Sequence, residues 1–259
     1  MDMQGRMALV TGAGSGLGRA AAIRLAEEGA AVAILSRTRE ELEEVARRIE
    51  ALGRDALILV ADTSDERQMR EAFETISDRF GRLDFVFANA GINGVWAPID
   101  ELTYEEWNKT ISINLGGTFL TLHLAVPLMR EAGGSIVITS SINGTRTFTT
   151  AGASAYSSTK AGQVALMQMA ALELARHRIR VNAICPGAIE SEIDDNTDRR
   201  NTQAARVPAD YPEGTVPLTG GKPGKSEEVA ELVLFLASDR SRHISGTPIW
   251  IDGSQSLLV

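Results

Sequence analysis

The sequence predicts an α/β protein with one doubly wound parallel sheet of about seven strands and helices on both faces. One observation is that short apolar runs alternate with longer amphipathic segments almost to the end of the chain. Another is that several runs are apolar without interruption, which is typical of strands covered on both faces. Alternation of this kind favours right-handed strand–helix–strand crossovers, which place successive strands parallel.

The expected strands are residues 7–10, 31–35, 56–60, 83–88, 135–139, 180–184 and 248–251. The expected helices are residues 17–28, 39–52, 66–80, 104–131, 155–177 and 226–238. Three helices are predicted to begin with a capping box, formed by Thr38 with Glu41, Asp65 with Gln68, and Thr103 with Glu106. Left-handed helix ends are expected at Gly29 and Gly53.

The chain of 259 residues is 44% hydrophobic and 23% charged, enough for one large core. No repeat or linker divides it, so residues 1–259 are expected to form a single domain. Residues 190–225 differ, because this stretch is polar, contains several prolines and lacks periodicity. A long irregular stretch in a compact domain is commonly a lid over an active site.

Composition also restricts the function class. The net charge of −8 argues against non-specific binding to nucleic acid. No apolar run approaches the roughly 18 residues of a membrane span, and the first residues show no secretory pattern. The lone cysteine, Cys185, suits a reducing cytoplasm. Because His123, His177 and His243 lie far apart without metal-ligand spacing, no metal site is expected.

A glycine-rich stretch, TGAGSGLG at residues 11–18, follows the first expected strand and opens the first expected helix. Glycine lets the backbone turn tightly and approach a pyrophosphate, while the helix N-terminus offers amide donors and positive potential. This context favours a dinucleotide site over an ordinary turn, which is the alternative. The expected cofactor contacts in the loop are Gly12, Gly14, Ser15, Gly16, Leu17 and Gly18.

The end of the second expected strand should meet the adenosine ribose of that dinucleotide, about 20 residues beyond the glycines. An acidic residue there would bind both ribose hydroxyls and repel a 2′-phosphate, but this chain has Ser36 followed by Arg37. A guanidinium pairs well with a phosphate. The sequence therefore favours NADP(H), with NAD(H) as the alternative if Arg37 is only a solvated residue before a helix.

Tyr156 and Lys160 stand four residues apart in the segment AYSSTKAG, so both would project from one helix face. A phenol has a reference pKa of about 10, and a neighbouring cation lowers that pKa by favouring the phenolate. Such a phenol is suited to moving protons. Beside a dinucleotide the pair indicates carbonyl–alcohol redox chemistry, and the alternative is an ordinary surface pair.

With these motifs in this order, the chain resembles the short-chain dehydrogenase/reductase family, whose fold is of the Rossmann type. The resemblance covers nearly the whole length and includes TGAGSGLG at 11–18, ADT at 61–63, ANAG at 88–91, INL at 113–115, SSING at 140–144, YSSTK at 156–160 and CPGAI at 185–189. The chain departs from the family pattern in Ala88, in Ser191 and Ser254, and in a longer gap between Ser141 and Tyr156.

The resemblance implies catalytic roles for four residues. Tyr156 would exchange a proton with the substrate oxygen, and Lys160 would lower the tyrosine pKa and hold the nicotinamide ribose. Ser141 would donate a hydrogen bond to the substrate oxygen, and Asn114 would position a water that connects Lys160 to solvent. The resemblance also implies cofactor contacts from Asp62, Thr63, Asn89, Ala90, Gly91, Tyr156, Lys160, Pro186, Gly187, Ile189 and Ser191.

The expected function is hydride transfer between NADP(H) and a small-molecule ketone or secondary alcohol. Alternatives are an NAD(H)-dependent enzyme of the same fold, a catalytically silent dinucleotide-binding regulator, and another doubly wound enzyme such as a methyltransferase. The resemblance implies a homotetramer or dimer, and the apolar C-terminus at residues 257–259 is expected to pack between subunits. Trp96, Phe148 and Tyr211 are expected either to line a substrate pocket or to fill the core.

Overall fold

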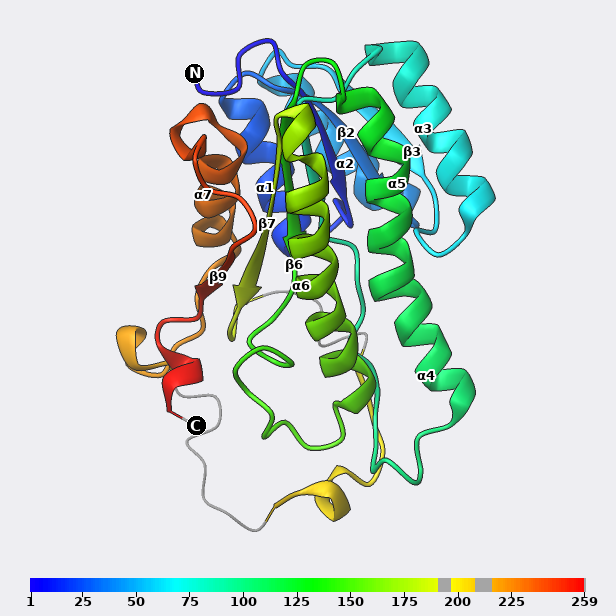
Figure 1. Ribbon diagram of the computed structural model, residues 1–259, viewed down its shortest axis with the longest axis vertical. Helices are drawn as coiled ribbons and strands as arrows, with labels where there is room; N and C mark the ends of the chain where they lie inside the picture. Colours follow the sequence, from blue (N-terminus) through cyan, green and yellow to red (C-terminus); the bar gives the residue numbers. More distant parts are fainter. Residues whose placement is uncertain (191–196, 208–215, 259) are drawn as a thin grey trace.

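The computed structural model describes residues 1–190, 197–207 and 216–258 and contains a seven-stranded parallel sheet in the order β3-β2-β1-β4-β6-β7-β9 (Figure 1). The strands are β1 (Met7–Thr11), β2 (Ala31–Ser36), β3 (Ala56–Val60), β4 (Phe85–Ala88), β6 (Gly134–Thr139), β7 (Ile179–Pro186) and β9 (Pro248–Ile251). Each expected strand is present with its ends shifted by two residues or fewer, so the predicted fold class is confirmed.

Helices cover both faces of the sheet because alternate strand side chains point to opposite faces. Val10, Ile34 and Phe87 pack under one layer, and Leu9 and Val86 pack under the other. The first layer consists of α1 (Gly16–Glu27), α2 (Arg39–Ala51) and α7 (Ser226–Ala237). The second consists of α3 (Glu66–Phe80), α5 (Gly117–Met129) and α6 (Ser154–Leu174), and Figure 1 shows α5 and α6 in front of the sheet.

The predicted helix signals were confirmed at Thr103, Gly29 and Gly53, half confirmed at Asp65, where the Gln68 side chain accepts from the backbone N–H of Asp62 and not of Asp65, and wrong at Thr38. Thr103 and Glu106 form a complete capping box, the Asp65 side chain accepts from the backbone N–H of Gln68, and both glycines have positive φ angles. Thr38 makes no side-chain cap bond. Its expected partner Glu41 is turned instead towards the glycine loop, where its carboxylate lies against Gly14.

The expected helix at 104–131 is interrupted. It consists of α4 (Tyr104–Ile111), a π-helical turn η1 (Ser112–Gly116) and α5. The span Tyr104–Met129 is long and apolar enough to cross a membrane by length and composition, a criterion that core helices also meet. Here α5 packs on the sheet, and the π turn carries Asn114.

A second, two-stranded parallel sheet was not predicted. It pairs β5 (Gly94–Trp96) with β8 (Thr197–Arg199), which belongs to the expected lid. Each strand has only three residues, too few for a period of two to be recognised in the sequence. Ser191 and Tyr211 of the expected lid lie outside the described residues.

The strand order reverses its direction of growth between β1 and β4, since β2 and β3 lie on one side of β1 and the later strands lie on the other. In open parallel sheets the chains leave such a switch point in opposite directions and open a crevice at the carboxyl ends of the strands. The glycine-rich loop after β1 and the ANAG segment after β4 both start at this crevice.

Candidate active site

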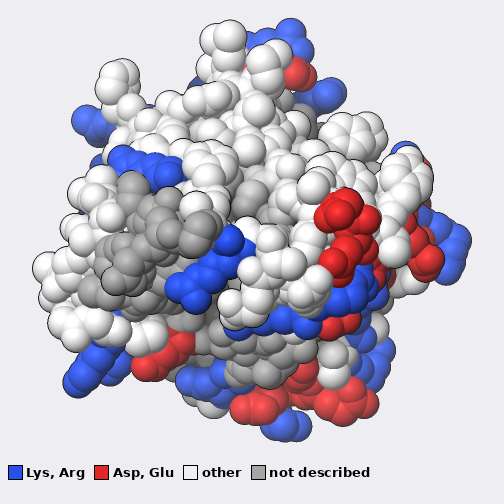
Figure 2. Space-filling model, turned by 90° about the horizontal axis from the view of Figure 1, so that it is seen from below, with Lys and Arg blue, Asp and Glu red and all other residues white. Residues whose placement is uncertain are grey.

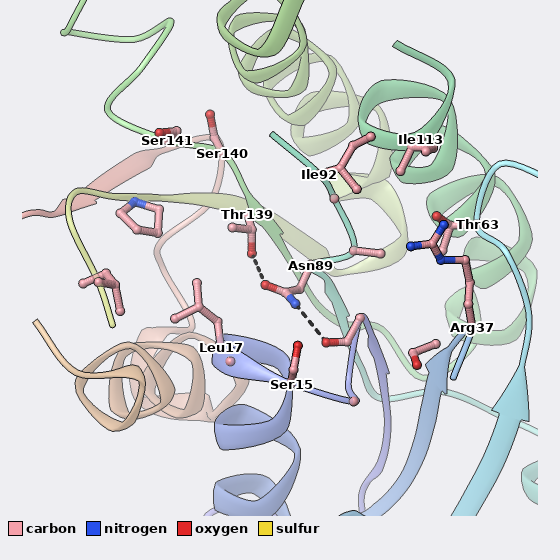
Figure 3. A pocket seen from close by; sticks show the side chains of 18 of the residues that line it. Ser15, Leu17, Arg37, Thr63, Asn89, Ile92, Ile113, Thr139, Ser140 and Ser141 are labelled. Atoms are coloured by element: carbon pink, nitrogen blue, oxygen red, sulfur yellow. Dashed lines mark hydrogen bonds between the residues drawn. The ribbon is translucent and has the colours of Figure 1, made fainter. Parts of the chain in front are cut away.

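A cavity of about 350 Å³ occupies this crevice (Figure 3). In Figure 3 Arg37 and Thr63 lie on one side of the pocket and Ser140 and Ser141 on the other. Predicted residues that line it are Gly12, Gly14, Ser15, Gly16, Leu17, Ser36, Arg37, Asp62, Thr63, Asn89, Ala90, Gly91, Ser141, Tyr156, Lys160, Pro186, Gly187 and Ile189. Two other predicted residues, Gly18 and Asn114, lie behind this lining, and Ser191 is outside the described residues.

The glycine loop has the shape that a pyrophosphate requires. Gly12 and Gly16 have φ angles of 65° and 48°, a region that favours glycine. A Cβ on Gly18 would overlap the Gly12 carbonyl, so this glycine allows α1 to start tightly against the loop. The N-cap of α1, Ser15, makes no side-chain cap bond, so that side chain leaves the first amides of the helix available to an anion.

Asn89 ties three strand ends together beneath the pocket. Its Nδ2 donates to the backbone carbonyl of Thr11 at 3.2 Å, and its Oδ1 accepts from Thr139 Oγ1 at 3.0 Å, a bond drawn in Figure 3. The backbone N–H groups of Asn89 and Ala90 both donate to Thr11 Oγ1. Asn89 therefore connects β1, β4 and β6 and shapes the backbone on which a cofactor would lie.

The end of the pocket expected to hold adenosine carries charges of both signs. Arg37 and Glu41 line it together with Ser36, and Glu41 was not among the predicted contacts. Asp62 is held in place because its Oδ1 accepts from the backbone N–H and the hydroxyl of Ser64 at 2.9 and 2.7 Å. Glu41 thus places a carboxylate in the pocket, although its position in the sequence, inside a predicted helix, did not indicate a cofactor contact.

Tyr156 and Lys160 face the same pocket from α6, and both are largely buried. The ammonium lies 5.3 Å from the centroid of the tyrosine ring, as the four-residue spacing predicted. Lys160 Nζ donates to the backbone carbonyl of Thr139 at 2.9 Å. Burial lowers the pKa of Lys160 from 10.5 to about 8, so the ammonium is still the main form at neutral pH.

Ser140 and Ser141 differ in where their hydroxyls point. Ser140 Oγ donates to the backbone carbonyl of Lys160 at 2.8 Å and is committed to the interior. Ser141 Oγ accepts from the backbone N–H of Asn143 at 3.1 Å, which leaves its own proton available to donate. Since both line the pocket, this geometry favours Ser141 as the donor to a substrate oxygen.

Asn114 is fully buried on the π turn. Its Oδ1 accepts from the backbone N–H of Ile92, and its Nδ2 donates to the Ile92 carbonyl and to Thr159 Oγ1. The side-chain amide therefore joins the strand-end segment of Ile92 to α6, one turn from Tyr156. The water-positioning role expected for Asn114 stays a prediction.

The sequence interpretation missed Gln163, which is 1% exposed on α6. Its Nε2 donates to the Asn114 backbone carbonyl at 3.0 Å and to Thr118 Oγ1 at 2.7 Å. A polar residue three positions after Lys160 on an apolar helix face is the signal that would have found it. Gln163 supports the π turn from behind the pocket.

Cys185 is buried close to Lys160, and burial raises the pKa of its thiol. A neutral, enclosed thiol fits a packing role better than the role of a nucleophile. Among the described residues, no group of three or more His, Cys, Asp or Glu side chains is arranged to hold a metal ion.

A doubly wound sheet with a glycine loop at its switch point is typical of enzymes that bind a dinucleotide. Comparison with known proteins defines the class more narrowly. The family described as Enoyl-(Acyl carrier protein) reductase matches residues 12–254. Levodione reductase of Leifsonia aquatica is 39% identical over 97% of this chain and 94% of that protein. The 3-oxoacyl-(acyl-carrier-protein) reductase of Thermotoga maritima is 35% identical over 98% of each chain.

Solved structures of similar proteins indicate the same class. A 3-ketoacyl-ACP reductase from Sinorhizobium meliloti is 59% identical, with a TM-score of 0.94 over 98% of this chain and 100% of that one. A carveol dehydrogenase from Mycobacterium avium in complex with NAD is 29% identical, with a TM-score of 0.88 over 99% of each chain. A short-chain dehydrogenase from Burkholderia cenocepacia in complex with NADP is 33% identical, with a TM-score of 0.86 over 98% and 99%. The chain belongs to the short-chain dehydrogenase/reductase family of oxidoreductases.

Proposed function

We propose that the protein transfers a hydride between a nicotinamide dinucleotide and a small-molecule ketone or secondary alcohol, with Tyr156 as the general acid or base. The observation that carries the proposal is that Tyr156 and Lys160 line the same pocket as the glycine loop. Relatives named levodione reductase and (-)-trans-carveol dehydrogenase support this substrate class.

Each residue of the site has a separate role in the proposed reaction. A bound nicotinamide supplies or accepts the hydride. Tyr156 moves the proton at the substrate oxygen, and the Lys160 ammonium favours its phenolate form. Ser141 donates a hydrogen bond to the same oxygen and fixes its position. Asn114 acts through the Ile92 backbone, which it holds at the edge of the pocket.

The cofactor would lie along the glycine loop and the backbone at Asn89–Gly91. We propose NADP(H), because Arg37 lines the expected adenosine end and Ser36 carries no charge to repel a 2′-phosphate. One observation favours NAD(H) as a second candidate: the Glu41 carboxylate lies at the same end and would repel that phosphate. Structural relatives include complexes with either cofactor.

The remaining expectations are proposals as well: a cytoplasmic enzyme that binds neither nucleic acid nor membrane and assembles as a homotetramer or dimer. Exposed Phe119 on α5 and Met169 and Leu172 on α6 offer an apolar surface for a second copy, as does exposed Leu257 near the C-terminus. Figure 2 shows basic and acidic side chains interspersed on the face at the lower end of Figure 1, towards which β7 and β9 run. An interspersed pattern favours a small uncharged substrate over an acidic carrier protein.

The test is turnover of a ketone and alcohol panel by the purified protein with NADPH, NADP, NADH and NAD. Tyr156→Phe should lower kcat by roughly 10²- to 10⁴-fold, the usual contribution of general acid–base catalysis. Tyr104→Phe, which changes an exposed tyrosine on α4, is the matched control and should keep full activity. Equal activity of wild type and Tyr156→Phe would show the role to be wrong, and no turnover by the wild type would favour the silent regulator.

A further inference from the structure

The small sheet of β5 and β8 holds part of the expected lid at the edge of the pocket. Ile92 lines the pocket, and the next residue, Asn93, donates from Nδ2 to Thr197 Oγ1 at 2.7 Å. The backbone N–H of Arg200 then donates to the Trp96 carbonyl at 2.9 Å. In Figure 1 the segment near residue 200 (yellow) runs beside the stretch that leads to α4. The lid and the pocket edge are therefore in direct contact.

The other edge of β5 connects to the catalytic helix. The backbone N–H of Ala97 donates to the carbonyl of Gly152 at 3.2 Å, two residues before α6 begins. A Cβ on Gly152 would come within 2.7 Å of Ala97 N, so the two segments pack tightly. β5 thus lies between the lid on one side and the start of the helix that carries Tyr156 on the other.

Three-residue strands are too short to hold a lid by backbone pairing alone. Side chains add to the pairing, and the main contribution comes from Arg200. Its Nη1 and Nη2 donate to the two carboxylate oxygens of Glu106 at 2.8 and 2.9 Å, and Nη2 also donates to the Glu101 carbonyl at 2.6 Å. Bidentate pairs of this kind are the stronger and more directional ion pairs.

The Glu106 carboxylate is held in place independently of Arg200. Its Oε2 also accepts from the backbone N–H of Thr103 in the capping box that starts α4. The hydrogen bonds from Arg200, followed by that backbone bond, lower the pKa of Glu106 to about 2. The pair therefore stays charged at any pH at which the protein would be assayed, and salt, not pH, is the variable that weakens it.

We propose that Arg200 is a positioning residue for substrate selectivity, which through Glu106 holds the lid strand against β5 and so fixes the wall of the substrate site. Arg200 acts through the strand and touches neither the cofactor loop nor Tyr156. This inference rests on the proposed function, because it assigns the lid side of the same pocket to the substrate.

The experiment compares the wild type with Arg200→Ala and Arg200→Lys, using cyclohexanone as a small ketone and 2-decalone as a bulky one, with NADPH and NADH. Arg79→Ala is the matched control, because Arg79 forms an ion pair of the same length with Asp55 far from the pocket. Melting temperature is measured for every variant, and hydrogen exchange is followed in peptides covering residues 94–96 and 197–200.

Arg200→Ala should raise the KM for cyclohexanone by roughly fivefold, the scale of a partly exposed ion pair. The selectivity for cyclohexanone over 2-decalone should fall, because the small ketone depends more on an enclosed site. The KM of the cofactor should not change. Arg200→Lys should lie between Ala and wild type, since lysine keeps the charge but loses the planar fork.

Two further readouts separate positioning from simple structural support. Raising NaCl from about 50 to 500 mM should move the wild-type KM towards that of Arg200→Ala and leave Arg200→Ala unchanged. Exchange at 197–200 should accelerate in Arg200→Ala and not in Arg79→Ala. Unchanged selectivity and exchange in Arg200→Ala would overturn the proposal, as would equal rises in both KM values.

Failure of the proposed function gives a different result. If the wild type turns over no ketone with any cofactor, the function is wrong, and hydrogen exchange alone decides whether Arg200 anchors the strand. Protection at 197–200 that is lost in Arg200→Ala supports the anchor, and protection that persists overturns it.

Discussion

At the glycine loop main chain packs against main chain, whereas the chain that follows Ile92 at the pocket edge is held by short strands and side-chain bonds. In the first region a Cβ on Gly18 would overlap a backbone carbonyl, and Asn89 binds three strand ends. In the second, three residues of β8 depend on Arg200, Asn93 and Trp96 for their contacts. From this comparison we infer a rigid region for the cofactor and an adjustable one for the substrate.

Lys160 lies where the two regions meet, and Lys160→Met is expected to have the largest effect on activity. We expect kcat to fall by at least about 10²-fold, because the charge proposed to favour the tyrosine phenolate is removed. Stability should change in the opposite direction. The folded-state pKa of about 8 lies below the ordinary 10.5, so the folded protein holds the proton less tightly than the unfolded chain does.

Wild-type stability should therefore gain from this group as pH rises from about 8 to 10.5, and below pH 8 the full cost of burying the charge remains. Lys160→Met should be more stable than wild type at pH 7 by about 1–3 kcal/mol, with a gap that narrows towards pH 10. Denaturant unfolding at several pH values measures this. A gap independent of pH would mean that burial does not lower the pKa of this lysine, because the folded and unfolded states would then bind the proton equally.

The second largest effect is expected from Gly18→Ala, which should disrupt the packing of the cofactor region. The added methyl meets the Gly12 carbonyl, which belongs to the backbone and cannot move away cheaply. We expect a loss of about 1–3 kcal/mol in the free energy of unfolding and weaker binding of either dinucleotide. Gly116→Ala is the matched control, because its nearest neighbour is the Ile111 carbonyl at 3.8 Å. Equal denaturation midpoints for Gly18→Ala and wild type would contradict the close-packed loop.

Arg37→Ala is expected to have the smallest effect. It should sharpen the comparison, because it should change the KM of the cofactor and leave the KM of the ketone unaffected. Loss of one charge-assisted bond of about 1.5 kcal/mol would raise the KM for NADPH about tenfold and leave that for NADH unchanged. Arg39→Ala is the control, because Arg39 lies two residues after Arg37, at the start of α2, and outside the pocket lining. If the wild type prefers NADH, Glu41→Gln should be the variant that improves NADPH binding.

The two regions also differ in how far they were predictable. The glycine loop, ANAG, Ser141 and the Tyr–Lys helix are short contiguous motifs whose surroundings follow from local strand–loop–helix order. Glu41 was misread as a cap for Thr38, since only the folded structure brings it against Gly14. Gln163 and Arg200 were missed because their partners lie 49 and 94 residues away.

The amino-acid pattern alone determined the sheet, its two helical layers and the residues that gather at the switch point, because periodicity and glycine placement act over a few residues. Tertiary structure alone decided the π turn at Asn114, the β5–β8 pairing and the ion pair between Arg200 and Glu106. These features depend on which distant side chains meet when the layers pack. Long-range contacts of that kind leave no local periodic signal in the chain.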